Sequence, residues 1–107
     1  MTTNNKVIFK GVECTISYLK YENGRTGLQL WDAEGPYARA TINVPEVTLA
    51  VNEVIIKDYA ENSGMYLALL TAGIITPTDK TINLGYVFAP IARLKNTPPE
   101  EGEKHNG

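Results

Sequence analysis

Short strand-like segments, most of them alternating between apolar and polar residues and several joined by turns of only a few residues, restrict the fold of this chain most. The segments are 7–9, 12–20, 26–32, 37–44, 53–57, 81–88 and 91–94. Turns as short as the one at residues 22–25 join antiparallel strands, because a parallel pair needs a crossover of a dozen or more residues. The pattern predicts an α+β fold, mainly an antiparallel sheet of about five to six strands, with one buried helix (62–72) before the last strand.

The turn at residues 22–25 admits two registers. A two-residue turn would place Tyr18 opposite Gln29 and put Leu28 on the other face of the hairpin. A three-residue turn, with Gly24 in the left-handed conformation, places Tyr18 opposite Leu28. The second register gathers the apolar residues of both strands on one face, so we predict it.

The predicted helix has signals at both ends. Asn62 or Ser63 provides an N-cap, and Gly73 is placed as the left-handed residue that follows the last turn. The residues 65–70 are apolar nearly all round, so we expect the helix to be largely buried.

Apolar residues are concentrated in one part of the chain. All 46 of the 107 residues that are apolar or aromatic lie within residues 1–94. We therefore expect a single compact domain over 1–94 and a flexible polar tail over 95–107. The formal net charge of −2 makes nucleic acid an unlikely partner, since binding through bulk charge requires a basic surface.

Three sequence features bear on the cellular compartment of the protein. The first residues show no apolar leader segment, and the longest uninterrupted apolar run, 65–70, is far too short to cross a membrane. The lone Cys14 has no partner for an internal disulfide. These features predict a cytoplasmic protein that does not enter a membrane, with Cys14 as a small core residue.

Catalytic residues are scarce. The only histidine, His105, lies in the predicted tail, so neither a nucleophile–base pair nor a zinc site can be assembled around Cys14. Asp58 and Glu61 are the nearest pair of carboxylates. A structural role for them, at the end of a strand and the start of a helix, is favoured over acid–base catalysis. The sequence thus predicts a protein that is not an enzyme and has no metal or cofactor.

Two groups of residues are candidate binding sites. Alternation places Trp31 on the face of its strand that does not carry Leu28 and Leu30. It places Tyr37 and Arg39 together on one face of the next strand, and Arg25 lies at the neighbouring hairpin tip. These residue types anchor protein interfaces. Alternatively, the helix covers this face, and the aromatic residues then belong to the core. The second group, Lys57, Ser63 and Gly64, lies at the helix start. It would bind a nucleotide or another anion there, unless it is only a capped helix start.

A resemblance adds context. The chain is similar to a family of short bacterial proteins known as domain-of-unknown-function family 4313, over about residues 6–94. The similarity is carried by GPYARATINVP (35–45), NEVIIKDYAENSGM (52–65) and AGII (72–75), and by shorter matches at 11–14, 21–25 and 85–87. The family brings no catalytic residues. It implies an origin on conjugative elements, prophages and phages of gut bacteria.

Together these observations predict a non-enzymatic interaction protein of a phage or mobile element. Its partner would be a host or defence protein that it binds and modulates, as anti-CRISPR proteins do. One alternative is a small-molecule domain that binds a nucleotide or anion at the start of helix 62–72. The other is a homodimer formed through the same aromatic face.

Overall fold

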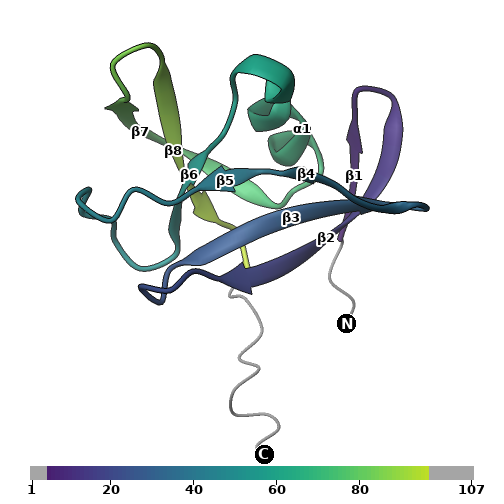
Figure 1. Cartoon of the computed structure of the whole chain (residues 1–107), viewed down its shortest axis with the longest axis horizontal. Coiled ribbons are helices and arrows are strands. Elements are labelled where there is room, and N and C mark those ends of the chain that lie inside the picture. The colour runs from purple at the N-terminus through teal and green to yellow at the C-terminus, as the bar shows by residue number, and fades with distance from the viewer. Residues whose placement is uncertain (1–4, 97–107) are drawn as a thin grey trace, which may run out of the picture.

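The computed structural model describes residues 5–96, which form two four-stranded antiparallel sheets and one short helix (Figure 1). The N-terminal sheet has the order β1 (Lys6–Phe9), β2 (Val12–Lys20), β3 (Thr26–Asp32) and β4 (Gly35–Arg39). The C-terminal sheet has the order β5 (Thr41–Ile42), β6 (Glu53–Ile56), β8 (Phe88–Leu94) and β7 (Ile75–Asn83). A 3-10 turn, η1 (Ala60–Asn62), precedes the helix α1 (Met65–Thr71). The α+β class is confirmed, but the strands form two sheets rather than one. The predicted tail lies, from residue 97 onward, outside the described residues.

The β2–β3 hairpin has the register predicted from the three-residue turn. Tyr18 lies opposite Leu28, and Gly24 has a φ of 87°. The Tyr21 amide donates to the Arg25 carbonyl at 2.8 Å and so closes the turn. This register places the apolar residues of both strands on the face that is buried.

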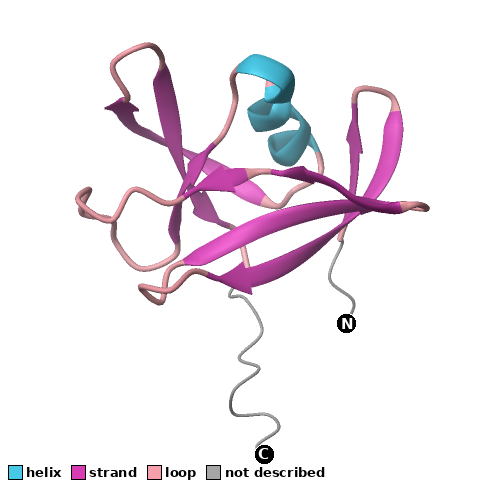
Figure 2. Ribbon diagram, in the orientation of Figure 1, coloured by secondary structure: helices cyan, strands magenta, loops and turns pink. Residues whose placement is uncertain are grey.

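The strand expected over 37–44 is divided at Ala40. The Ala40 amide donates to the carbonyl of Leu28 in the N-terminal sheet at 2.9 Å, and its carbonyl accepts the Lys57 amide, next to β6, at 2.8 Å. Ala40 and Thr41 are both buried, so the alternation of the strand is lost here. In Figure 2 the arrow of β4 therefore passes directly into β5 of the other sheet.

The main core lies between the inner faces of the two sheets and α1. Its large members are Val7, Phe9, Ile16, Leu28, Leu30, Val54, Ile56, Met65, Leu69, Ile74, Ile75 and Leu94. A smaller apolar cluster covers the other face of the C-terminal sheet, around Ile55 and Ile91. The C-terminal sheet is thus packed on both faces, whereas the core covers only one face of the N-terminal sheet.

The helix is shorter and less buried than predicted. Only Met65 and Leu69 are buried, and the Leu67 side chain is 67% exposed, so the expected burial all round is wrong. The predicted C-terminal end is confirmed. Gly73 has a φ of 78°, and the Ile74 amide donates to the Leu69 carbonyl at 3.0 Å, as in a Schellman motif.

The last two strands form a hairpin whose turn falls inside the segment predicted as a strand over 81–88. The Leu84 amide donates to the Val87 carbonyl at 2.8 Å, so β7 ends before this turn and β8 begins after it. As a result Tyr86 and Phe88 are 74% and 65% exposed instead of lying on an inner face. Pro90 lies opposite Thr81, directly after an irregular stretch of β7, in agreement with the bulge that a strand proline suggested.

Candidate interaction site

The outer face of the N-terminal sheet carries Trp31 and Arg39 together. Strand alternation turns Leu28 and Leu30 into the core, and the residues between and after them therefore point outward. Neighbouring strands add further outward side chains. We call Ser17, Tyr21, Gln29, Trp31 and Arg39 the outer-face cluster.

Arg39 is held in place by a buried glutamine. Its Nε donates to Gln29 Oε1 at 2.8 Å, and its guanidinium carbon lies 6.0 Å from the centre of the Tyr21 ring. Gln29 is itself only 9% exposed, and its Nε2 donates to the carbonyls of Ala38 and Leu30, each at 3.1 Å. The arginine is therefore fixed by a side chain whose own orientation is fixed by the backbone.

Trp31 is partly open to solvent. Its side chain is 39% exposed, and its indole Nε1 donates to Ser17 Oγ on β2 at 2.7 Å. Satisfying the polar edge within the sheet leaves the apolar part of the ring at the surface. A tryptophan held in this way loses little side-chain entropy when a partner covers it.

Tyr21 is a member of the cluster that the sequence patterns did not identify. A Cβ on Gly27 would lie 2.7 Å from Leu19 Cδ1 and 2.8 Å from Tyr21 Cε2, so these two side chains cover the glycine closely. The Tyr21 hydroxyl also bonds to Thr41 Oγ1 at 2.8 Å. A glycine inside a strand pattern is the signal that points to such a close approach.

Tyr37 does not join the cluster. The β3–β4 pairing shifts register between Leu30 and Trp31, which lies opposite Pro36, and Tyr37 is left without a partner across the strands. Its ring instead packs edge-on against Phe9 of the core, with centroids 6.3 Å apart. Tyr37 remains 37% exposed, but alternation no longer places it beside Trp31.

Arg25 has a structural task of its own. Its guanidinium donates to the Val44 carbonyl at 2.9 Å and to the Val47 carbonyl, and so ties the hairpin tip to the loop between β5 and β6.

The helix does not cover the outer-face cluster, because Met65 and Leu69 of α1 pack with Leu28 and Leu30 in the core on the opposite side of the sheet.

At the predicted anion site, the groups at the helix start that would bind a ligand are already bonded within the fold. The carboxylate of Asp58 accepts the amides of Gly64 at 3.0 Å and Tyr66 at 2.9 Å, which are the donors that an anion would need. Lys57 pairs with Glu61 at 2.7 Å, and Ser63 is exposed without capping the helix.

The expected N-caps are therefore wrong. Asn62 Nδ2 instead donates to the Arg39 carbonyl at 2.7 Å, and the capping oxygen comes from Asp58, six residues before Gly64. This role also explains Asp58 without acid–base catalysis.

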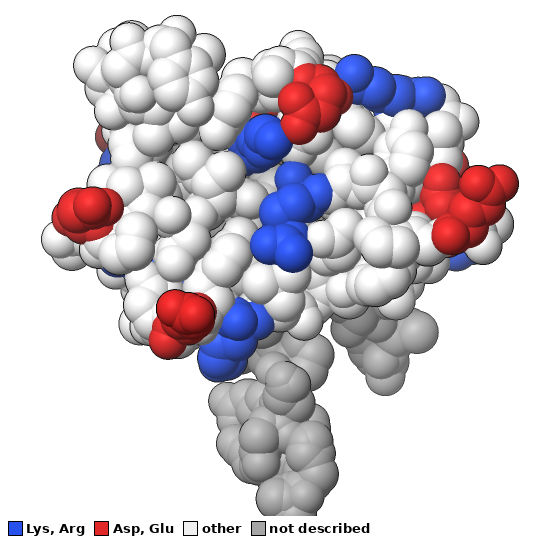
Figure 3. Space-filling view, viewed as in Figure 1, with Lys and Arg blue, Asp and Glu red and all other residues white. Residues whose placement is uncertain are grey.

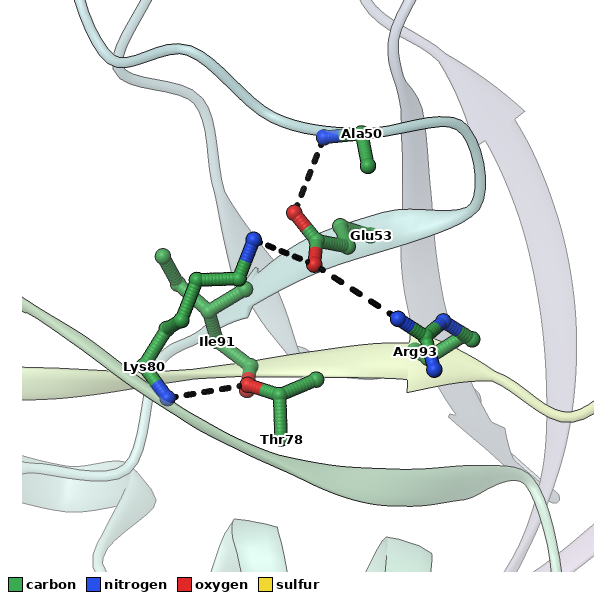
Figure 4. A network of polar contacts seen from close by, with 6 residues as sticks. All are labelled: Ala50, Glu53, Thr78, Lys80, Ile91 and Arg93. Atoms are coloured by element: carbon green, nitrogen blue, oxygen red, sulfur yellow. Dashed lines mark hydrogen bonds and ion pairs between the residues drawn. The ribbon is translucent and has the colours of Figure 1, made fainter.

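A buried carboxylate outside the cluster forms the ion-pair network drawn in Figure 4. The Glu53 side chain is 1% exposed. Its Oε1 accepts the Ala50 amide at 2.8 Å, and its Oε2 lies 2.7 Å from Lys80 Nζ and 3.9 Å from Arg93 Nη2. The close Lys80 ammonium, more than any other contact, holds the pKa of Glu53 below its usual value against the opposing effect of burial.

Other reactive groups are placed as structural residues. Cys14 is buried, and its burial, followed by the charge of Asp32, raises the pKa of the thiol. Within residues 5–96, no three side chains of the His, Cys, Asp and Glu types gather closely enough to hold a metal ion.

Apolar surface also remains away from the cluster. Besides the exposed Tyr86 and Phe88 at the β7–β8 turn, a groove of about 380 Å³ runs between α1 and β1. Leu67 and Ile8, which are 67% and 59% exposed, form part of its lining.

Comparison with models of known families, with curated proteins and with solved structures found no match for this chain. The resemblance to family 4313 therefore stays a prediction. Over the stretch that the structure describes, no helix has the length and apolar character needed to span a membrane.

Proposed function

We propose that this chain is a non-enzymatic interaction protein that binds a partner protein through its outer-face cluster. The observation that carries the proposal is the exposed Trp31 on the same sheet face as an Arg39 already oriented by Gln29. Tryptophan and arginine are the residues most enriched among interface anchors. Both stand on strands of a sheet, which position a binding group better than a loop does.

The proposed partner is a host or defence protein in the bacterial cytoplasm. The resemblance to family 4313 supports an origin on a phage or mobile element, where small proteins of this kind modulate host defence as anti-CRISPR proteins do. The binding mode and the partner class are separate parts of the proposal, so the cluster can be tested before a partner is named.

Quantitative affinity capture from a bacterial host lysate tests the proposal, with wild-type chain, Trp31→Ala and Tyr86→Ala as baits. Tyr86 is a matched control because it is a 74% exposed aromatic residue outside the cluster. We expect one protein to be retained saturably by the wild type and by Tyr86→Ala, and to be lost by Trp31→Ala.

Thermal unfolding checks that the baits are equally folded. Retention of every partner by Trp31→Ala, or self-association as the only saturable interaction, would contradict the proposal. The second result would favour the homodimer instead.

A further inference from the structure

We propose that the Arg39 guanidinium binds a carboxylate on an acidic patch of the partner. The inference rests on the proposed function and names the chemistry of the surface that the cluster recognises. Arg39 is held in a fixed orientation and has no ion-pair partner within residues 5–96.

The orientation of Arg39 suits a planar anion. Gln29 Oε1 takes the Nε donor at 2.8 Å, and the guanidinium lies 6.0 Å from the centre of the Tyr21 ring. The two terminal nitrogens remain as a fork that matches the two oxygens of a carboxylate. Because the fork is already oriented, binding costs less side-chain entropy than it would for a mobile arginine.

Arg39 also differs from four other cations of the described fold in having no internal acidic partner. Lys6, Lys57, Lys80 and Arg93 each lie within ion-pair distance of a carboxylate. Between residues 5 and 96, no carboxylate forms an ion pair with Arg39, although its side chain is exposed. Its hydrogen-bonding partner is the neutral Gln29, so its positive charge is not neutralised by a contact within the fold.

Two other basic residues are linked through the backbone to the neighbours of Arg39. The Lys57 amide is bonded to the carbonyl of Ala40, next to Arg39, and Arg25 pairs through the backbone with Tyr21, whose ring Arg39 covers. Figure 3 shows Lys and Arg atoms one below another along the middle of the view, with acidic atoms beside them near the upper and lower ends. An exposed arginine without an ion-pair partner within residues 5–96 favours an acidic patch on the partner.

A protein carboxylate fits Arg39 better than a nucleic-acid backbone does. Both terminal nitrogens of Arg25 already donate to backbone carbonyls, and Lys57 is paired with Glu61. Of these three cations in the described fold, only Arg39 keeps its terminal donors for a ligand. A phosphate track needs several such cations in a row.

The test uses the full ¹⁵N-labelled chain and three probes: a hexaglutamate peptide, a hexaglutamine peptide and a thymidine hexanucleotide. The sequence has only three arginines, so the Nε–Hε signal of Arg39 can be assigned by substitution. Binding is also followed by the fluorescence of Trp31, the only tryptophan. We expect hexaglutamate to shift the Arg39 signal saturably, and hexaglutamine to leave it unchanged.

Two variants separate the fork from simple charge. Arg39→Lys keeps the charge but loses the fork, and we expect it to bind hexaglutamate about tenfold more weakly, as for loss of a charge-assisted hydrogen bond. Arg93→Lys makes the same change at a 55% exposed arginine of the other sheet and should leave binding unchanged.

Equal binding by Arg39→Lys, no shift of the Arg39 signal, or tighter binding of the hexanucleotide would overturn the inference. If Arg39 fails in this assay while Trp31→Ala still loses a captured partner, only the acidic-partner inference falls. If hexaglutamate binds at Arg39 but no protein is captured saturably, the carboxylate site stands and the proposed function falls.

Discussion

Replacing Lys80 by methionine should lower the free energy of unfolding, because the buried carboxylate of Glu53 then loses its closest cation. In this variant the Glu53 side chain, 1% exposed, keeps the Ala50 amide at 2.8 Å, but the cation that remains within ion-pair distance is Arg93 at 3.9 Å. Contacts with a charged group contribute about 1.5–3 kcal/mol. Lys80 is 48% exposed and partly screened by water, so we expect a loss near the lower end, about 1.5 kcal/mol at pH 7.

The stability difference between the wild type and Lys80→Met should depend on pH. The pKa of Glu53 is lowered on folding, chiefly by Lys80, so the stabilisation is complete above the unfolded-state pKa of about 4.3 and is lost as the pH falls through the folded-state value. The free energies of unfolding of the wild type and Lys80→Met should therefore converge toward pH 3.

Urea unfolding at pH 7 and pH 3 measures the loss of stability caused by Lys80→Met and how far that loss decreases at low pH. The matched control is Lys6→Met, since Lys6 pairs with Glu13 at 3.0 Å with both side chains 61% exposed, and it should cost no more than about 0.5 kcal/mol. A Lys80→Met loss no larger than that of the control, or equally large at both pH values, would refute the reasoning.

Three further substitutions test the fold around the site by urea unfolding. Asp58→Ala removes the acceptor for two amides at the start of α1 and should cost about 1–2 kcal/mol, whereas Asp58→Asn should retain most of the stability; equal losses would argue against the cap. Gly27→Ala places a Cβ 2.7 Å from Leu19 Cδ1 and should cost about 1–3 kcal/mol, with displacement of the Tyr21 ring signals in NMR spectra. Phe88→Ser alters a 65% exposed side chain and should change stability by less than about 0.5 kcal/mol; a larger loss would show that the β7–β8 turn is packed.

Local patterns predicted the features that are decided within a few residues. The register of the β2–β3 hairpin followed from Gly24 and from the alternation on either side of it. The end of α1 at Gly73 followed from the conformational freedom of glycine after a helix. In both places the local sequence leaves a single arrangement that buries the apolar residues.

Features decided by distant contacts were not predictable in this way. The segment over 37–44 alternates regularly, and only its pairing with β6 places its second half in another sheet. Asp58 caps α1 across the η1 turn, beyond the spacing of local capping motifs.

The candidate site was predicted in part for the same reason. Alternation placed Trp31 and Arg39 on the outer face, but the shift in register at Trp31 separated Tyr37 from them. Gln29 reads as an ordinary polar strand residue, and only the three-dimensional pairing shows that it orients Arg39.

The backbone of Ala40 joins the two sheets, with its amide bonded to one and its carbonyl to the other. The two sheets also share the main apolar core, so opening either sheet exposes core residues of the other. The two halves of the molecule should unfold as one cooperative unit, and slowly exchanging amides in β3 and β6 should show the same opening free energy. A partner that binds the N-terminal sheet would then also protect the C-terminal sheet, which it does not touch.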